Sequence, residues 1–170
     1  PICYSYSSNE KKGLSNPVVG RTIEDKDGNL WIGTEGGGLN YYNRRTREFK
    51  WYRPQEGRNS ISHNNVKALY YDADKEIIWI GTHLGGLNKL DIRSGHFTHY
   101  RMEEGNPATL PSDIIRDIIP YKSLLIVATQ NGVCLFNPAN GQCQQLFKDS
   151  KEGKSIKMIA DVTFRSEERR

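Results

Sequence analysis

The chain has 170 residues, of which 36% are hydrophobic, 10% aromatic and 26% charged, and its formal net charge is +4. This length allows one domain or a piece of a larger one. Every apolar run is far shorter than the roughly 18–20 residues of a membrane-spanning helix, and the N-terminus lacks the basic and apolar regions of an export signal. Basic residues are interspersed with acidic ones. The sequence therefore predicts no direct contact with nucleic acid, and contact with a membrane only through segments outside this chain.

An internal repeat dominates the sequence. When segment 31–49 is aligned with segment 79–97, ten of the nineteen positions are identical, including a tryptophan and three glycines. A third, more divergent copy begins near Ile126, and a related segment precedes each copy. Such periodicity is typical of proteins in which similar units stack side by side and bury their apolar faces against each other.

The repeat divides the chain into five parts. In chain order they are the last strand of a preceding unit (1–14), three complete units (15–61, 62–109 and 110–150), and the start of a following unit with a tail (151–170).

Each complete unit contains four short extended segments. In the second unit these are Val66–Tyr71, Ile77–Gly81, Gly86–Leu90 and His96–Tyr100, all rich in β-branched and aromatic residues. Turn residues separate them, and Asp91–Gly95 is typical of a type I turn followed by a left-handed glycine. Four antiparallel strands in about 47 residues predict a β-propeller blade. The fold class is therefore all-β, a propeller fragment of about three four-stranded antiparallel blades with partial strands at both ends.

The repeated residues have structural interpretations. The tryptophans are expected to fill the space between neighbouring blades, and the glycine of each W-I-G-T segment to allow close approach near a crowded axis. The glycine pairs are expected to close the second hairpin at positive φ. These structural positions are Trp31, Gly33, Gly37, Gly38, Phe49, Trp79, Gly81, Gly85, Gly86 and Phe97.

Three cysteines, Cys3, Cys134 and Cys143, give no disulfide framework. A Cys134–Cys143 bridge is conceivable because these two residues flank a turn. The expected hairpin register places them on opposite faces, so we predict free, mostly buried thiols.

The repeated motif resembles the two-component regulator propeller repeat. The first unit carries the pattern at Val19, Ile23, Asp25, Gly28, Leu30–Thr34, Gly37–Leu39, Thr46, Phe49 and Tyr52, and the second at the corresponding positions from Val66 to Tyr100. The third unit departs most, because Ile126, Ala128 and Cys143 replace the tryptophan, a glycine and the phenylalanine. WD and kelch repeats fit less well.

This resemblance implies part of the periplasmic sensor region of a Bacteroides-type hybrid two-component system. Members of the family detect glycan-derived oligosaccharides and control genes for polysaccharide utilisation. The resemblance implies an oligosaccharide ligand, and a histidine kinase whose catalytic part lies outside this chain. Because three blades cannot close a ring, we expect further blades of the same protein and self-association, as a homodimer, to cover the exposed faces.

Candidate ligand-binding residues lie in the loops that lead into the first strand and out of the second strand of each unit. In a propeller these loops gather on one face, and their residues differ between units while their neighbours repeat, as expected for a variable site on a constant scaffold. The candidates are Asn16, Glu35, His63, Asn64, His83, Asp113 and Gln130.

Other chemistry is not indicated. Asp25–Asn29 lacks the glycine position and flanking helices of a calcium loop, and the glycine run 36–38 precedes a strand rather than a helix. His96 and His99 would point to opposite faces of a strand. The sequence thus predicts no catalytic residue, metal site or cofactor. Two alternatives to sensing remain open: a purely structural dimerisation module with the ligand bound elsewhere, and a propeller lyase or hydrolase.

Overall fold

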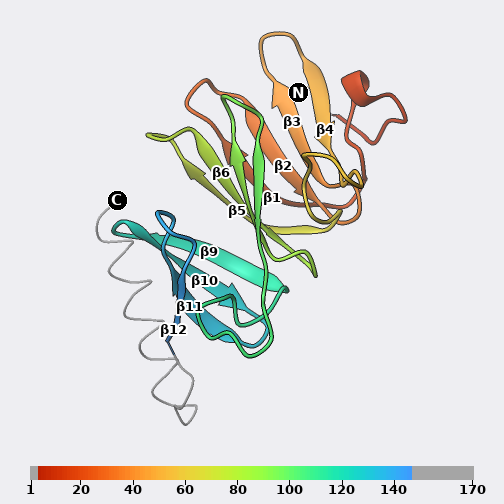
Figure 1. Ribbon diagram of the computed structural model, residues 1–170. Coiled ribbons are helices and arrows are strands. Elements are labelled where there is room, and N and C mark those ends of the chain that lie inside the picture. Colours follow the sequence, from red (N-terminus) through yellow and green to blue (C-terminus); the bar gives the residue numbers. More distant parts are fainter. Residues whose placement is uncertain (1–3, 147–170) are drawn as a thin grey trace.

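The computed structural model describes residues 4–146 and confirms the all-β fold, with three four-stranded antiparallel sheets. Figure 1 shows the sheets as successive blades, from orange through green to blue. The first blade comprises β1 (Val19–Glu24), β2 (Leu30–Thr34), β3 (Leu39–Asn43) and β4 (Glu48–Tyr52). The second comprises β5 (Val66–Asp72), β6 (Ile77–Thr82), β7 (Leu87–Asp91) and β8 (Phe97–Tyr100). The third comprises β9 (Ile115–Tyr121), β10 (Leu124–Thr129), β11 (Gly132–Phe136) and β12 (Cys143–Gln145).

The strands of each blade follow one another in space as they do in sequence. In every sheet neighbouring strands are joined by short hairpins, and the strands of the second blade lie within a residue of the predicted bounds. The predicted turn after β7 is present, because Gly95 has φ of 73° and its N–H donates to the carbonyl of Asp91 at 2.8 Å. First strands contact each other between blades, β1 against β5 and β5 against β9.

The repeated tryptophans lie between blades, as predicted. Trp31 is 2% exposed and packs with residues of the second blade, including Val66 and Ile80. Trp79 is also 2% exposed and packs with residues of the third blade, including Ile115 and Phe136. Each tryptophan therefore joins its own blade to the next one along the chain.

The glycine of each W-I-G-T segment lies against the first strand of the following blade. A Cβ at Gly33 would lie 2.8 Å from Cγ1 of Val66, and one at Gly81 would lie 2.5 Å from Cγ2 of Ile115. Real Cβ atoms do not approach side chains this closely, so the absence of a side chain lets adjacent blades meet.

The glycine pairs differ from the expectation in one respect. Gly38 and Gly86 have positive φ of 75° and 72°, as predicted, but Gly37 and Gly85 do not. The first glycine of each pair is required by space instead, because a Cβ there would lie 2.3 Å from Oγ of Ser15 or 2.4 Å from Oγ of Ser62. The prediction of positive φ was therefore wrong for the first member of each pair.

A buried hydrogen-bond network recurs in the first two blades. Asn40 Oδ1 accepts from the N–H of Ser15 at 2.8 Å, and its amide nitrogen donates to Ser15 Oγ at 2.6 Å. Asn88 makes the same pair of bonds with Ser62, at 2.9 and 2.6 Å. The network ties the loop before each first strand to the third strand. In the third blade the equivalent position is Cys134.

The cysteines of the third blade do not lie as predicted. Cys143 pairs with Phe136, and Cys134 pairs with Gln145. Because paired residues and residues two apart share a face of the sheet, Cys134 and Cys143 lie on the same face, in one apolar cluster. The prediction of opposite faces was wrong, whereas the prediction of free, buried thiols is confirmed for these two residues. Cys3 lies outside the described residues.

The N-terminal segment packs on the outer side of the first blade. Residues 4–14 contain the 3-10 helix η1 (Glu10–Lys12) and an isolated bridge between Tyr6 and Leu14, where the sequence predicted a strand. The Tyr4 hydroxyl lies 2.7 Å from that of Tyr42. The predicted start of a following unit, at 151–170, lies outside the described residues. No helix in the described chain is long and apolar enough to cross a membrane.

An ion-pair cluster crosses the seam between the first two blades. Lys26 of the first blade and Arg93 of the second both bond to the Glu76 carboxylate. The hydrogen bond from Lys26, with that from Arg93, lowers the pKa of Glu76 below its ordinary value. A lowered pKa means that the native state favours the charged carboxylate, so the resulting stabilisation is present above the ordinary pKa and is lost as the pH falls through the native-state pKa.

We expect Glu76→Gln to lower the Tm at neutral pH, and the difference from the parent chain to shrink as the pH falls into the range where the carboxyl is protonated. The measurement is a series of thermal melts from neutral to acidic pH. Glu104→Gln, in an exposed loop, serves as the control and should leave the Tm unchanged throughout. If the Tm difference between Glu76→Gln and the parent chain stays constant with pH, the stabilising role of the ionised Glu76 carboxylate is contradicted.

Candidate functional site: the loops at one edge of the blades

Loops of successive blades meet along one edge of the structure, where second strands end and first strands of the next blade begin. The carbonyl of Asn64 accepts from the N–H groups of Gly36 (3.1 Å) and Gly38 (2.7 Å) across the first seam. The carbonyl of Asp113 accepts from Leu84 (3.2 Å) and Gly86 (2.9 Å) across the second seam. Two of the predicted ligand residues, Asn64 and Asp113, thus hold neighbouring blades together through their main chain.

Main-chain bonds within each blade fix the residues that follow the second strands. The N–H of Glu35 donates to the carbonyl of Val18, that of His83 to Asn65, and that of Gln130 to Ile114, at 2.9 to 3.0 Å. These bonds place the three candidate residues after the second strands at equivalent positions in successive blades. Their side chains are free to differ, because the main chain supplies the pairing.

Glu35 is engaged by a residue that the sequence analysis missed. Lys67, on the first strand of the second blade, places Nζ 2.8 Å from Oε1 of Glu35. The pair spans the first seam, and both side chains are partly exposed. A surface pair of this kind adds little stability, so its main effect is to place one cation and one anion side by side at this edge.

His63 and His83 lie close enough to influence each other. Burial lowers the pKa of His63, and the nearby His83 and Arg101 lower it further. The imidazole is therefore neutral near pH 7. Its Nδ1 accepts from the N–H of Asn65 at 3.0 Å, so in the neutral ring Nε2 carries the proton and is a hydrogen-bond donor.

A cavity of about 230 Å³ opens at the second seam and is lined by Lys67, His83, Ile114, Ile115 and Arg116. Two cationic side chains and one imidazole thus surround an apolar floor formed by two isoleucines. Arg116 lies on β9 at the position that Lys67 holds on β5. Cavities that combine an apolar lining with a few polar groups are typical of small-ligand sites, and this one offers donors suited to hydroxyl or carboxylate oxygens.

The other candidates have local partners. Oδ1 of Asn16 accepts from the N–H of Val18 at 2.9 Å, and Oδ1 of Asp113 accepts from Met102 at 2.7 Å. Gln130 is exposed. The structure therefore brings Glu35, His63, Asn64, His83 and Asp113 to the two seams at one edge, with Asn16 beside the first glycine pair. Gln130 holds the equivalent position after β10, where no following blade is described. Their part in binding a ligand remains a prediction.

Two cationic residues of this edge, Lys67 and Arg116, were not among the predicted site residues. The predicted residues lie in loops that vary between units, whereas these two lie within first strands. A sequence signal was present, because Gly20, Lys67 and Arg116 occupy one position in the three units. Variation at a strand position is as informative as variation in a loop when its side chain opens onto the same edge. Within residues 4–146 no group of three or more His, Cys, Asp or Glu side chains could hold a metal ion.

Comparison with known proteins supports the pattern of the repeat. Residues 13–36 and 60–83 match the family model described as two component regulator propeller. Each matched segment covers the loop before a first strand, that strand, and the second strand with its tryptophan. No curated protein matches the sequence.

Solved structures show the same fold. The chain is similar to an extracellular domain described as that of the hybrid two component system BT3049 from B. thetaiotaomicron, with 28% identity, a TM-score of 0.71 and 78% of this chain covered. A second such domain, of BT4673 from the same organism, has 25% identity, a TM-score of 0.69 and 85% coverage. The matches cover 19% and 20% of those chains, so this chain spans about a fifth of their length. Saccharomyces cerevisiae Sqt1 shares the fold at 16% identity, with a TM-score of 0.57, 78% of this chain covered and 36% of that chain.

Proposed function

Because this chain carries repeats of the two-component regulator propeller family, we propose that it is part of the extracytoplasmic sensor region of a hybrid two-component system. The single observation that carries this proposal is the match of both tryptophan-bearing repeats to that family model. The similarity to two extracellular domains of B. thetaiotaomicron supports it. The compartment would be the periplasm, and the histidine kinase would belong to segments outside this chain.

The ligand proposed for this region is an oligosaccharide released from a glycan. The edge cavity supports this, because Lys67, His83 and Arg116 offer hydrogen-bond donors around an apolar floor. Sugars present many hydroxyl oxygens that such donors bind, and those derived from acidic glycans add carboxylates. The site is non-catalytic, and its role is to bind and report.

A ligand at this edge would touch two blades at once. His83 belongs to the second blade and Arg116 to the third, and the seam between them is held by main-chain hydrogen bonds to the Asp113 carbonyl. A ligand that bonds to both side chains favours one relative position of the blades over others. That preference, passed to further blades and to a dimer partner, is the signal that we propose the sensor region transmits.

Further blades of the same protein would cover the open sides of the fragment. On the first blade Ile32, Tyr42 and Phe49 form an apolar cluster that contacts no other described blade, with Tyr4 and Trp51 packed against it. We propose that a preceding blade packs there and that the complete region forms a homodimer.

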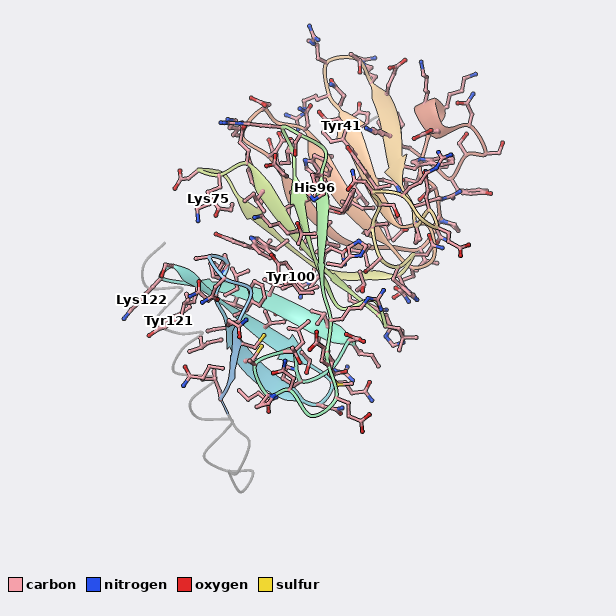
Figure 2. The ribbon with its side chains drawn as sticks, viewed as in Figure 1. Tyr41, Lys75, His96, Tyr100, Tyr121 and Lys122 are labelled. Carbon is pink, nitrogen blue, oxygen red and sulfur yellow. The ribbon has the colours of Figure 1, made fainter. Side chains whose placement is uncertain are left out.

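Calorimetric titration tests the ligand proposal. The probes are defined oligosaccharides, one each from neutral, uronate-containing and sulfated glycans, titrated first into the complete extracytoplasmic region and then into this chain. We expect His83→Ala and His63→Ala each to weaken binding about threefold to tenfold, as expected for the loss of one hydrogen bond. The matched control is His96→Ala, an exposed histidine in the turn between β7 and β8, labelled in Figure 2.

The outcomes distinguish a ligand-binding sensor from a structural module and from an enzyme. Binding by the complete region that both edge variants leave unchanged would exclude this edge as the site. In that case the fragment would be a structural or dimerisation module with the ligand bound elsewhere. Turnover of any probe by this chain alone would instead indicate an enzyme.

A further inference from the structure

The third blade replaces two repeated residues with cysteine, and the two positions are neighbours in the sheet. Asn40 and Asn88 occupy the first position in blades one and two, and the phenylalanines Phe49 and Phe97 occupy the second. In the third blade these positions hold Cys134 and Cys143. The repeat thus loses a buried amide and a buried ring together and gains a pair of thiols.

The sheet register places the two thiols side by side. Cys134 lies on β11 and Cys143 on β12, where Phe136 pairs with Cys143 and Gln145 pairs with Cys134. The cysteines are therefore diagonal neighbours on one face of an antiparallel pair. This spacing is wider than that of directly opposed residues, so a disulfide between them requires a small adjustment of the two strands. Their exposed fractions are 0% and 9%, and they belong to one apolar cluster.

The two side chains interact directly. A hydrogen bond between the thiols, together with burial, raises the pKa of Cys134, and the same hydrogen bond lowers the pKa of Cys143. The proton is therefore held on Cys134, and Cys143 is the thiol that ionises first. Thiolates rather than thiols attack disulfides.

Cys143 is also the more accessible of the two. It lines a cavity of about 270 Å³ between the second and third blades, together with Tyr100, Phe136 and Gln142. Figure 2 shows Tyr100 at the junction of these two blades. A small reagent that enters this cavity meets Cys143, with Cys134 behind it in the core.

We propose that Cys134 and Cys143 form an intrachain disulfide that ties the last described strand, β12, to β11. The Cys143 thiolate attacks a small-molecule disulfide and displaces one thiolate, which leaves a mixed disulfide on Cys143. Cys134 then loses its proton, attacks the Cys143 sulfur and displaces the second thiolate. Overall, two protein thiols are oxidised to one disulfide and one small-molecule disulfide is reduced to two thiols. Disulfides persist in oxidising extracytoplasmic compartments, the location given by the proposed function, but the chemistry can be tested independently of that location.

The test uses the whole chain with Cys3→Ser, so that only the two cysteines of the third blade remain. The folded protein is incubated with oxidised glutathione, then unfolded, alkylated and digested with trypsin. Segment 123–148 contains no internal lysine or arginine, so both cysteines fall in one tryptic peptide. We expect this peptide to lack alkyl groups and to be lighter than the reduced peptide by two hydrogen atoms.

Two controls relate the reaction to the folded geometry. The same chain oxidised in denaturant should close the disulfide about tenfold more slowly, or slower still, because the fold no longer holds the thiols together. With Cys134→Ser added, Cys143 should accumulate as the glutathione adduct, since no second thiol resolves it. If folded protein instead yields a peptide alkylated at both cysteines, or carrying glutathione on both, the proposal is overturned. Neither result depends on glycan binding, so the disulfide and the sensing proposal fail separately.

Discussion

Replacing Gly86 with alanine is expected to lower the free energy of unfolding by about 2–5 kcal/mol, the sum of a backbone penalty and a steric one. Gly86 has φ of 72°, where a residue with a Cβ is strained. The added Cβ would also lie 2.3 Å from the carbonyl oxygen of Tyr100. That oxygen belongs to the main chain of β8 and cannot swing aside as a side chain would. Urea denaturation, followed by tryptophan fluorescence, measures the change.

Gly95 provides a matched control for this substitution. Its φ is 73°, but a Cβ there would meet no atom within 4 Å. Gly95→Ala therefore carries only the backbone penalty, about 1–2 kcal/mol. The difference between the two variants isolates the steric contribution. Equal losses for Gly86→Ala and Gly95→Ala would show that the close approach to Tyr100 is relieved at no cost.

Trp79→Ala is expected to destabilise the chain by about 3–5 kcal/mol, as large aromatic-to-alanine changes in cores do. The indole lies 5.3 Å from the Phe136 ring and 6.0 Å from the Tyr100 ring, measured between centroids. Its removal leaves a cavity between the second and third blades. Because the loss falls on the seam, hydrogen exchange should rise in both blades and not only in the blade that carries the substitution.

Two further variants limit the interpretation of this result. Trp79→Phe should cost less than Trp79→Ala, because a ring still fills part of the space. Met102→Ala, at a side chain that is 42% exposed, should change the free energy of unfolding by no more than about 0.5 kcal/mol. A loss for Trp79→Ala no larger than that for Met102→Ala would contradict the role of the tryptophan between blades.

Much of the fold could be predicted because residues that recur in two units reveal which positions the packing between blades requires. Trp31 and Trp79 recur with the same neighbours, so a position that fills a seam in one blade fills it in the next. Gly33 and Gly81 recur because, at both described seams, the first strand of the following blade takes the space beside them. Neither inference needs a three-dimensional model, since the sequence holds two closely similar solutions to the same packing problem.

The predictions that were wrong concerned side-chain facing and backbone conformation, which residue spacing alone does not determine. Cys134 and Cys143 were expected on opposite faces, but a change of one residue in hairpin register moves a side chain to the other face. The pairing of Phe136 with Cys143 fixes that register, and the turn between them does not reveal it. The glycine pairs show a similar limit, because Gly37 and Gly38 both recur in the second unit but for different reasons, the first for space and the second for its positive φ.

The sequence could predict where the candidate site lies, but not which groups of its residues form it. Loops that vary between units did converge on one edge, which follows from the propeller arrangement. Their side-chain roles could not be predicted, because Asn64 and Asp113 contribute their carbonyls across the seams. Lys67 and Arg116 come from strands, and only the three-dimensional arrangement shows that their side chains reach the same edge as the loops.

The main-chain carbonyls that bind across both seams have a consequence for how such a protein diversifies. Asparagine stands at position 64 and aspartate at 113, yet the main-chain carbonyl of each accepts from two N–H groups at equivalent positions of the preceding blade. This contact between blades uses only main-chain atoms, so it does not depend on which side chain the residue carries. Substitutions at these positions leave the main-chain acceptor in place, so the contact between blades is kept while the side chain changes. At 113 the substitution also removes the side-chain bond to the N–H of Met102.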